Sequence, residues 1–261
     1  ADKALTVDTE KTGDGEDVVS ILDMKADLDD KILKIGEKIS IRRFEKVTAD
    51  VVASYIHGGG RIGVLVAGNG ASDDAAKEAL TNIAMQIAAM NPQYISRDEI
   101  SADELAKMKE ITIDSALNDP FSLPKPVLSK LIEKAVAGVW SAEDVAIYEE
   151  KKSNMNFLPN FLSKEAKAQL AEIACADKEE ISGNKIFSGL VEGRISKQMK
   201  EICLLDQVYV KAEDGKQTVA AYLKSVNPAL KIAKFVRFEV GEGMEKKNED
   251  FAAEVAKQMN V

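Results

Sequence analysis

Three consecutive glycines, Gly58, Gly59 and Gly60, form the segment that comes nearest to a phosphate-binding loop. Such loops hold phosphate oxygens with backbone N–H groups, and a Lys-Ser or Lys-Thr pair follows at the start of a helix. Here Arg61 follows, and the next residues are apolar and β-branched, which predicts a strand. We therefore expect Gly58 to Arg61 to form a structural loop between two antiparallel strands.

His57 directly precedes these glycines and is the only histidine among the 261 residues. A single histidine excludes the two-histidine motifs of zinc hydrolases, and no serine or cysteine lies in an evident nucleophile motif. His57 has two interpretations, because its side chain either folds back on the strand or projects towards a partner, and the residue alone favours the first. We expect no catalytic residue, metal site or cofactor, and a protein that is not an enzyme.

The amino-acid composition limits the cellular compartment and the class of binding partner that we expect. The two cysteines, Cys175 and Cys203, are typical of free thiols in a reducing compartment. The formal net charge of -9 disfavours nucleic acid and anionic membranes as partners. No run of about 18 apolar residues and no secretory signal occurs. We expect a cytoplasmic protein that binds another protein, with the mitochondrial matrix as the alternative location.

Hydrophobic periodicity predicts the elements that position these residues. Apolar residues at helical spacing predict helices at residues 22–35, ended by Gly36, and at 72–90. Ser101 and Glu104 have the spacing of a capping box, which predicts the start of another helix. Alternating patterns predict strands at residues 39–44, 51–57, 61–67 and 232–240.

The order of these elements indicates an α+β fold, an antiparallel sheet flanked by helices. Residues 101–203 read as a helical hairpin, and proline-punctuated helical patterns at 113–184 predict an inserted helical unit near its tip. The sequence therefore predicts a long protruding helical hairpin that carries this inserted unit.

Several segments resemble the elongation factor Ts family in their order and spacing. They are KIGEKISIRR from Lys34, SYIHGGGRIGVLV from Ser54, IAAMNPQY from Ile87, VEGR from Val191, KEICLL from Lys200 and FVRFEVGEG from Phe235. The resemblance covers about residues 31–112 and 185–259. Residues 113–184 lie outside the family pattern as we identify it.

The resemblance implies a guanine nucleotide exchange factor that binds the GTPase elongation factor Tu and promotes GDP release, so that GTP can bind during translation elongation. It also implies that Ile35, Gly36 and His57 face the GTPase, and that a C-terminal helix around Phe251 contacts it. No nucleic acid or membrane is implied. The alternative is an interaction module without exchange activity, in which the helical arm forms a homodimer.

The sequence also departs from this family. The opening ADKALTV reads like the middle of a helix, and neither the family's N-terminal helical module nor its Thr-Asp-Phe-Val motif occurs. We therefore expect a truncated or processed chain that begins inside the first core subdomain. The expected divisions are a helical remnant of that subdomain (1–36), the second core subdomain (37–100), the hairpin arm (101–205) with its insertion (113–184), the return to the second core subdomain (206–247) and a C-terminal helical module (248–261).

Overall fold

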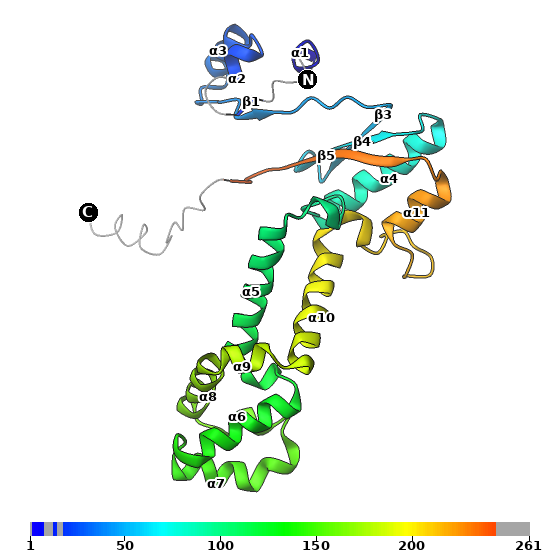
Figure 1. Ribbon diagram of the computed structural model, residues 1–261. Helices are drawn as coiled ribbons and strands as arrows, with labels where there is room; N and C mark the ends of the chain where they lie inside the picture. Colours follow the sequence, from blue (N-terminus) through cyan, green and yellow to red (C-terminus); the bar gives the residue numbers. More distant parts are fainter. Residues whose placement is uncertain (1, 8–12, 15–17, 244–261) are drawn as a thin grey trace, which may run out of the picture. The chain divides into compact units, whose positions relative to one another are not determined.

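The computed structural model describes residues 2–7, 13–14 and 18–243. Within these residues the chain forms two compact units (Figure 1). The first unit contains the residues up to Asn91 and those from Tyr209 onwards, and the second contains Pro92–Val208.

A three-stranded antiparallel sheet forms the centre of the first unit, with the strand order β3-β4-β5. Its strands are β3 (Val51–His57), β4 (Ile62–Asn69) and β5 (Lys231–Glu239). The predicted hairpin between β3 and β4 is confirmed, and its register pairs His57 with Ile62. Strand β5 pairs with the other side of β4, with Val64 opposite Arg237.

Helix α4 (Asp74–Met90) covers one face of this sheet. It begins at Asp73, whose side chain accepts a 2.7 Å hydrogen bond from the Ala76 N–H. Gly68 of β4 lies close to the helix, since a Cβ there would be 3.0 Å from Leu80 Cδ1. Helix α11 (Val219–Val226) packs against α4. The buried side chains of α4 recur at helical spacing and are Ala76, Ala79, Leu80, Ile83, Ala84, Gln86, Ile87 and Ala88.

The described residues in the N-terminal part of the first unit include the helices α1 (Asp2–Leu5), α2 (Val18–Ile21) and α3 (Lys25–Ile35). A small core of Val18, Leu22 and Phe44 joins α2 to the segment that follows α3. The helix predicted at 22–35 is confirmed from Lys25 onwards.

The strand predicted at residues 39–44 is wrong. Only Arg43 and Phe44 form a strand, β2, and it pairs with β1 (Gly13–Asp14) in a separate two-stranded sheet. Ile41 packs on the small core without strand pairing, so its alternation with polar neighbours reflects one buried side and not a ladder of hydrogen bonds.

Two long helices, α5 (Ala102–Asn118) and α10 (Lys185–Ile202), lie side by side in the second unit (Figure 1). The predicted capping box starts α5, because Ser101 Oγ accepts from the Glu104 N–H at 3.2 Å and the Glu104 carboxylate accepts from the Ser101 N–H at 2.9 Å. Leu204, near the end of the second unit, donates a 2.9 Å hydrogen bond from its N–H to the carbonyl of Tyr94, near the start of the same unit.

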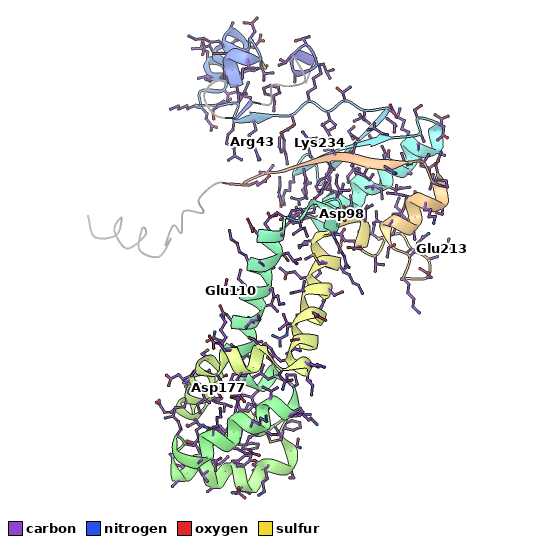
Figure 2. All side chains as sticks on the ribbon, viewed as in Figure 1. Arg43, Asp98, Glu110, Asp177, Glu213 and Lys234 are labelled. Atoms are coloured by element: carbon purple, nitrogen blue, oxygen red, sulfur yellow. The ribbon has the colours of Figure 1, made fainter. Side chains whose placement is uncertain are left out.

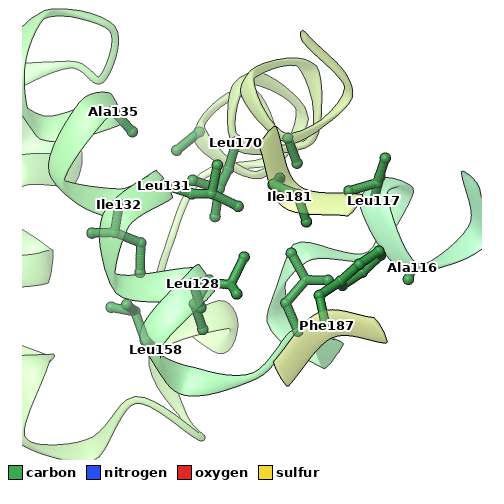
Figure 3. Packing of buried hydrophobic residues seen from close by; sticks show 14 of the residues in the cluster. Ala116, Leu117, Leu128, Leu131, Ile132, Ala135, Leu158, Leu170, Ile181 and Phe187 are labelled. Carbon is green, nitrogen blue, oxygen red and sulfur yellow. The ribbon is translucent and has the colours of Figure 1, made fainter. Parts of the chain in front are cut away.

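A helical subassembly joins α5 to α10 and encloses a hydrophobic core. Side chains from α5, the intervening helices and α10 converge in it (Figure 3). Phe187 of α10 is 1% exposed at this core. The intervening elements are the helices α6 (Lys125–Gly138), α7 (Ala142–Lys151), α8 (Lys164–Ala176) and α9 (Lys178–Ser182) and the 3-10 turns η2 (Pro120–Ser122), η3 (Lys152–Asn154) and η4 (Leu158–Asn160).

The predicted α+β class is confirmed by the antiparallel sheet and its flanking helices. Further 3-10 turns, η1 (Arg97–Glu99) and η5 (Leu204–Asp206), flank the long helices. Among the residues described, no helix has both the length and the apolar character needed to cross a lipid bilayer.

Candidate functional site

The end of helix α3 carries two of the residues expected to face a partner. Ile35 is the last residue of the helix and Gly36 is its C-cap, with φ at 78°. The Gly36 N–H donates to the Ile32 carbonyl at 2.8 Å and closes the last turn. A left-handed cap of this kind favours glycine, which has no Cβ to strain the backbone.

Helix α3 buries none of its side chains. Leu33 is 84% exposed and Ile35 is 57% exposed, although a surface helix normally packs its apolar side chains against a core. Nothing lies within 4 Å of the position that a Cβ on Gly36 would take, so the surface beside Ile35 is open. Leu33 and Ile35 are two residues apart and point to different sides of the helix, so they are two separate exposed apolar side chains.

The β3–β4 hairpin carries the third predicted residue, His57. All three glycines of its turn have positive φ, at 60° for Gly58, 66° for Gly59 and 96° for Gly60. The Gly60 N–H donates to the His57 carbonyl at 3.3 Å, and the Arg61 carbonyl accepts from the Val240 N–H at 2.9 Å. The turn leads into a strand, so its N–H groups do not have the helix start that a phosphate-binding loop provides.

His57 is the last residue of β3 and its side chain is exposed. The imidazole Nδ1 lies 3.0 Å from the hydroxyl oxygen of Tyr55. Tyr55 is half-buried on the same face of the strand, because residues two apart on a strand point the same way. The other imidazole nitrogen, Nε2, makes no hydrogen bond within the part of the chain that the structure describes.

The sheet face opposite α4 carries an open apolar groove of about 430 Å³. Ile56, next to His57, lines it and is 72% exposed. One edge of this face is covered by the segment after α3. The Arg43 guanidinium lies 4.5 Å from the centre of the Phe238 ring, and Lys234 forms a 3.0 Å salt bridge with Glu45 (Arg43 and Lys234 are labelled in Figure 2).

Ile56 and Leu33 are exposed residues that the sequence interpretation did not single out. A signal for Leu33 exists, because Ile32 and Leu33 are adjacent on a helix and cannot both lie in one narrow apolar stripe. A comparable signal for Ile56 is lacking, since its alternation with Tyr55 fits either face of a sheet. Phe251, the remaining predicted contact residue, lies outside the described residues.

Within the described ranges, no three or more histidine, cysteine, aspartate and glutamate side chains come together as a metal site. Cys175 is exposed, Cys203 is buried and both are free thiols. Among the predicted contact residues, Ile35 presents an exposed aliphatic side chain and His57 an exposed imidazole, and both suit contact with a protein. The fold and this surface define an α+β protein with a candidate protein-binding site on its first unit.

Comparison with protein families identifies the chain more closely. The family model described as Elongation factor TS matches residues 7–151 and 141–242. The chain belongs to the elongation factor Ts family. Because the matches run through residues 113–184, our expectation that this segment lies outside the family pattern is wrong.

Individual proteins that are similar to this chain belong to the same family. Elongation factor Ts of Clostridioides difficile (strain 630) is 36% identical over 258 residues, which cover 94% of this chain and 65% of the relative. Elongation factor Ts of Clostridium novyi (strain NT) is 34% identical over 264 residues, covering 95% and 66%. That of Halothermothrix orenii is 35% identical over 239 residues, covering 91% and 58%. The chain thus spans less than two thirds of the length of these relatives.

Proposed function

We propose that this chain is a guanine nucleotide exchange factor that binds elongation factor Tu and promotes the release of GDP, so that GTP can bind during translation elongation. The family match over most of the chain carries the proposal. The exposure of Ile35 and His57 supports it, since side chains that face a partner must be accessible. The proposed site of action is the bacterial cytoplasm, where this step of translation takes place.

The proposed contacts are Ile35, Gly36 and His57, with Phe251 as a further contact outside the described residues. Ile35 and Leu33 offer apolar area at the end of α3, and His57 offers a hydrogen-bonding group at the end of β3. No cofactor or metal ion is needed, because the proposed reaction is the exchange of a ligand bound to the partner.

Binding energy is the source of the exchange activity in this proposal. A factor that binds the nucleotide-free GTPase more tightly than its GDP form must weaken GDP binding by the same factor. Each 1.4 kcal/mol of this coupling corresponds to about a tenfold change in affinity. The contacts must therefore be held rigidly enough to distort the partner instead of yielding to it.

The first unit has features that provide such rigidity at His57. Strand β3 pairs with β4 along its whole length, and α4 packs on both strands. The hydrogen bond between Val240 and Arg61 ties the hairpin to the end of β5. The side chain of His57 therefore projects from a hydrogen-bonded sheet and not from a free loop.

The test is the rate at which a fluorescent GDP analogue leaves elongation factor Tu as this chain is added. We expect the wild-type chain to accelerate release of the analogue from elongation factor Tu, and the Ile35→Ala variant to accelerate it less. Ile186→Ala is a matched control, since Ile186 is a similarly exposed isoleucine, at 54% against 57%, on α10 of the second unit. No complex and no acceleration at any concentration would refute the proposal.

A second candidate function, self-association through the helical arm, is favoured by a groove between α5 and α10. The groove has a volume of about 380 Å³, and Ile100, Leu105, Ile195 and Met199 supply its apolar lining. Lys109 lines it from α5 and Glu192 from α10, and in the described part of the chain neither forms a salt bridge.

Opposite charges on the two sides of one groove suit a two-fold dimer, because each Lys109 can meet Glu192 of the second copy. Sedimentation equilibrium over a range of concentrations tests this arrangement. Lys109→Glu should weaken association, and Lys109→Glu combined with Glu192→Lys should restore it. A wild-type chain that stays monomeric at high concentration would exclude this function.

A further inference from the structure

We infer that Tyr55 positions the imidazole of His57 and fixes its tautomer, so that His57 meets the partner as a hydrogen-bond donor through Nε2–H. The contact between Tyr55 and His57 stands on the structure alone. The part that concerns the partner rests on the proposed function.

The geometry holds the two side chains together at the end of β3. Register places Tyr55 opposite Val64 of the central strand, where its half-buried ring packs on the sheet. The ring centres of Tyr55 and His57 are 5.8 Å apart and the ring planes meet at 39°, so the rings do not stack. The Tyr55 hydroxyl instead reaches His57 Nδ1 at 3.0 Å, a hydrogen-bonding distance.

The chemistry of the two groups fixes the direction of this hydrogen bond. A phenol hydroxyl is a good donor and a poor acceptor, because its oxygen lone pair is delocalised into the ring. The unprotonated nitrogen of an imidazole is a good acceptor. Tyr55 Oη–H therefore donates to Nδ1, and the ring proton of neutral His57 lies on Nε2.

This tautomer determines what the partner must present. An Nε2–H group donates one hydrogen bond, so the matching partner atom is an acceptor, such as a backbone carbonyl or a carboxylate oxygen. An exposed histidine without Tyr55 would exchange between tautomers and side-chain conformers, and binding would have to restrict it. Tyr55 prepares the donor in advance and thereby acts as a positioning residue.

A first test needs no partner. His57 is the only histidine in the chain, so long-range nitrogen–proton NMR of the imidazole gives one unambiguous set of signals. The spectra are recorded at about pH 8.5, where a free imidazole is neutral. We expect the Nε2–H tautomer to dominate in the wild-type chain and the second tautomer to become more populated in Tyr55→Phe. Equal tautomer populations in the two proteins would overturn the inference.

A second test measures affinity for elongation factor Tu in a double-mutant cycle. Tyr55→Phe keeps the packed ring and removes one hydrogen bond, so we expect about two- to tenfold weaker binding. His57→Gln retains an N–H donor that does not depend on a tautomer, so Tyr55→Phe should cost little in that background. Equal losses in both backgrounds would show that the Tyr55 hydroxyl affects binding independently of His57 and would overturn its positioning role.

A matched control variant tests whether the effect is specific to Tyr55. Failure of the proposed function can also be told apart from failure of this inference. Tyr94→Phe also removes one tyrosine hydroxyl, the one that donates to Glu104 in the second unit at 3.2 Å, and should leave the tautomer of His57 unchanged. A wild-type chain that does not bind elongation factor Tu would refute the proposed function. The NMR comparison would then still decide whether Tyr55 fixes the tautomer of His57.

Discussion

Replacing Gly36 by alanine tests whether the end of α3 depends on a left-handed backbone. Gly36 has φ at 78°, and nothing lies within 4 Å of a Cβ at this position, so the substitution introduces strain without a clash. Placing an L-residue in this conformation costs roughly 1–2 kcal/mol. Alanine also makes the unfolded chain less flexible, which offsets about 0.4–1 kcal/mol, and the net loss is about 1 kcal/mol.

This loss should be local. Helix α3 buries no side chain, so its last turn can open without the rest of the unit unfolding. Hydrogen exchange of the residue 36 amide, which bonds to the Ile32 carbonyl, should therefore become about five times faster in Gly36→Ala, with little change in melting temperature. Release of the GDP analogue should slow as well, because the orientation of Ile35 depends on that turn.

Two matched variants sharpen this prediction. Gly36→Asn should lose less protection than Gly36→Ala, since asparagine tolerates a left-handed backbone and Asn91 already adopts one at the end of α4, with φ at 46°. Gly70→Ala should be much more damaging, because φ is 92° and a Cβ there would lie 2.1 Å from the Ala229 carbonyl oxygen. If Gly36→Asn and Gly36→Ala open the turn equally, backbone strain is not the cause and the reasoning is refuted.

Further predictions concern the core, one carboxylate and His57. Phe187→Ala should reduce the free energy of unfolding by about 3–5 kcal/mol in denaturant titrations, whereas the neighbouring exposed Ile186→Ala should change it by less than about 0.5 kcal/mol. Burial alone would raise the pKa of the Asp144 carboxyl, but hydrogen bonds from Ser163 and Ser141 outweigh it and lower that pKa. The stabilisation from the Asp144 carboxylate is therefore present above the carboxyl's pKa in the unfolded chain, and it is lost as the pH falls through the lowered pKa of the folded protein. In an acid titration, the Asp144→Asn variant should therefore lose less stability over that pH range than the wild-type chain. His57→Ala should slow release of the GDP analogue while circular dichroism stays unchanged, and loss of the folded state would instead assign His57 to the core.

The sequence predicted elements whose signals are local. The Gly58–Gly60 turn, the capping box at Ser101 and the apolar spacing of α4 each lie within one short segment, and the structure confirms them. The glycine stop at Gly36 also appears where the pattern predicted it. Each of these features depends on backbone conformation or on one helical face, which a few neighbouring residues determine.

Pairings between distant residues could not be predicted in the same way. The segment 39–44 alternates like a strand, but its partner is the two-residue strand Gly13–Asp14, whose sequence carries no strand signal. The exposure of Ile56 depends on what covers the second face of the sheet, and alternation does not specify this. The contact between Tyr55 and His57 follows from their spacing of two residues, but only coordinates give its distance.

The position of the second unit in the chain has a consequence for folding order. Asn69 of β4 pairs with Lys231 of β5, so residues 70–230 form the connection between these two neighbouring strands. Contacts this far apart slow folding, because closing a long loop costs conformational entropy before the contacts form. Tyr94 and Cys203 form a parallel bridge, and Ile202 accepts hydrogen bonds from the N–H groups of Gln93 and Tyr94.

A folded second unit therefore brings the two ends of its own chain together and acts as a short connection within the first unit. The β3–β4 hairpin and α4 precede the second unit in the sequence, whereas β5 follows it and is synthesised later. The sheet should acquire its third strand last, and its rate of completion should depend on how fast the second unit folds.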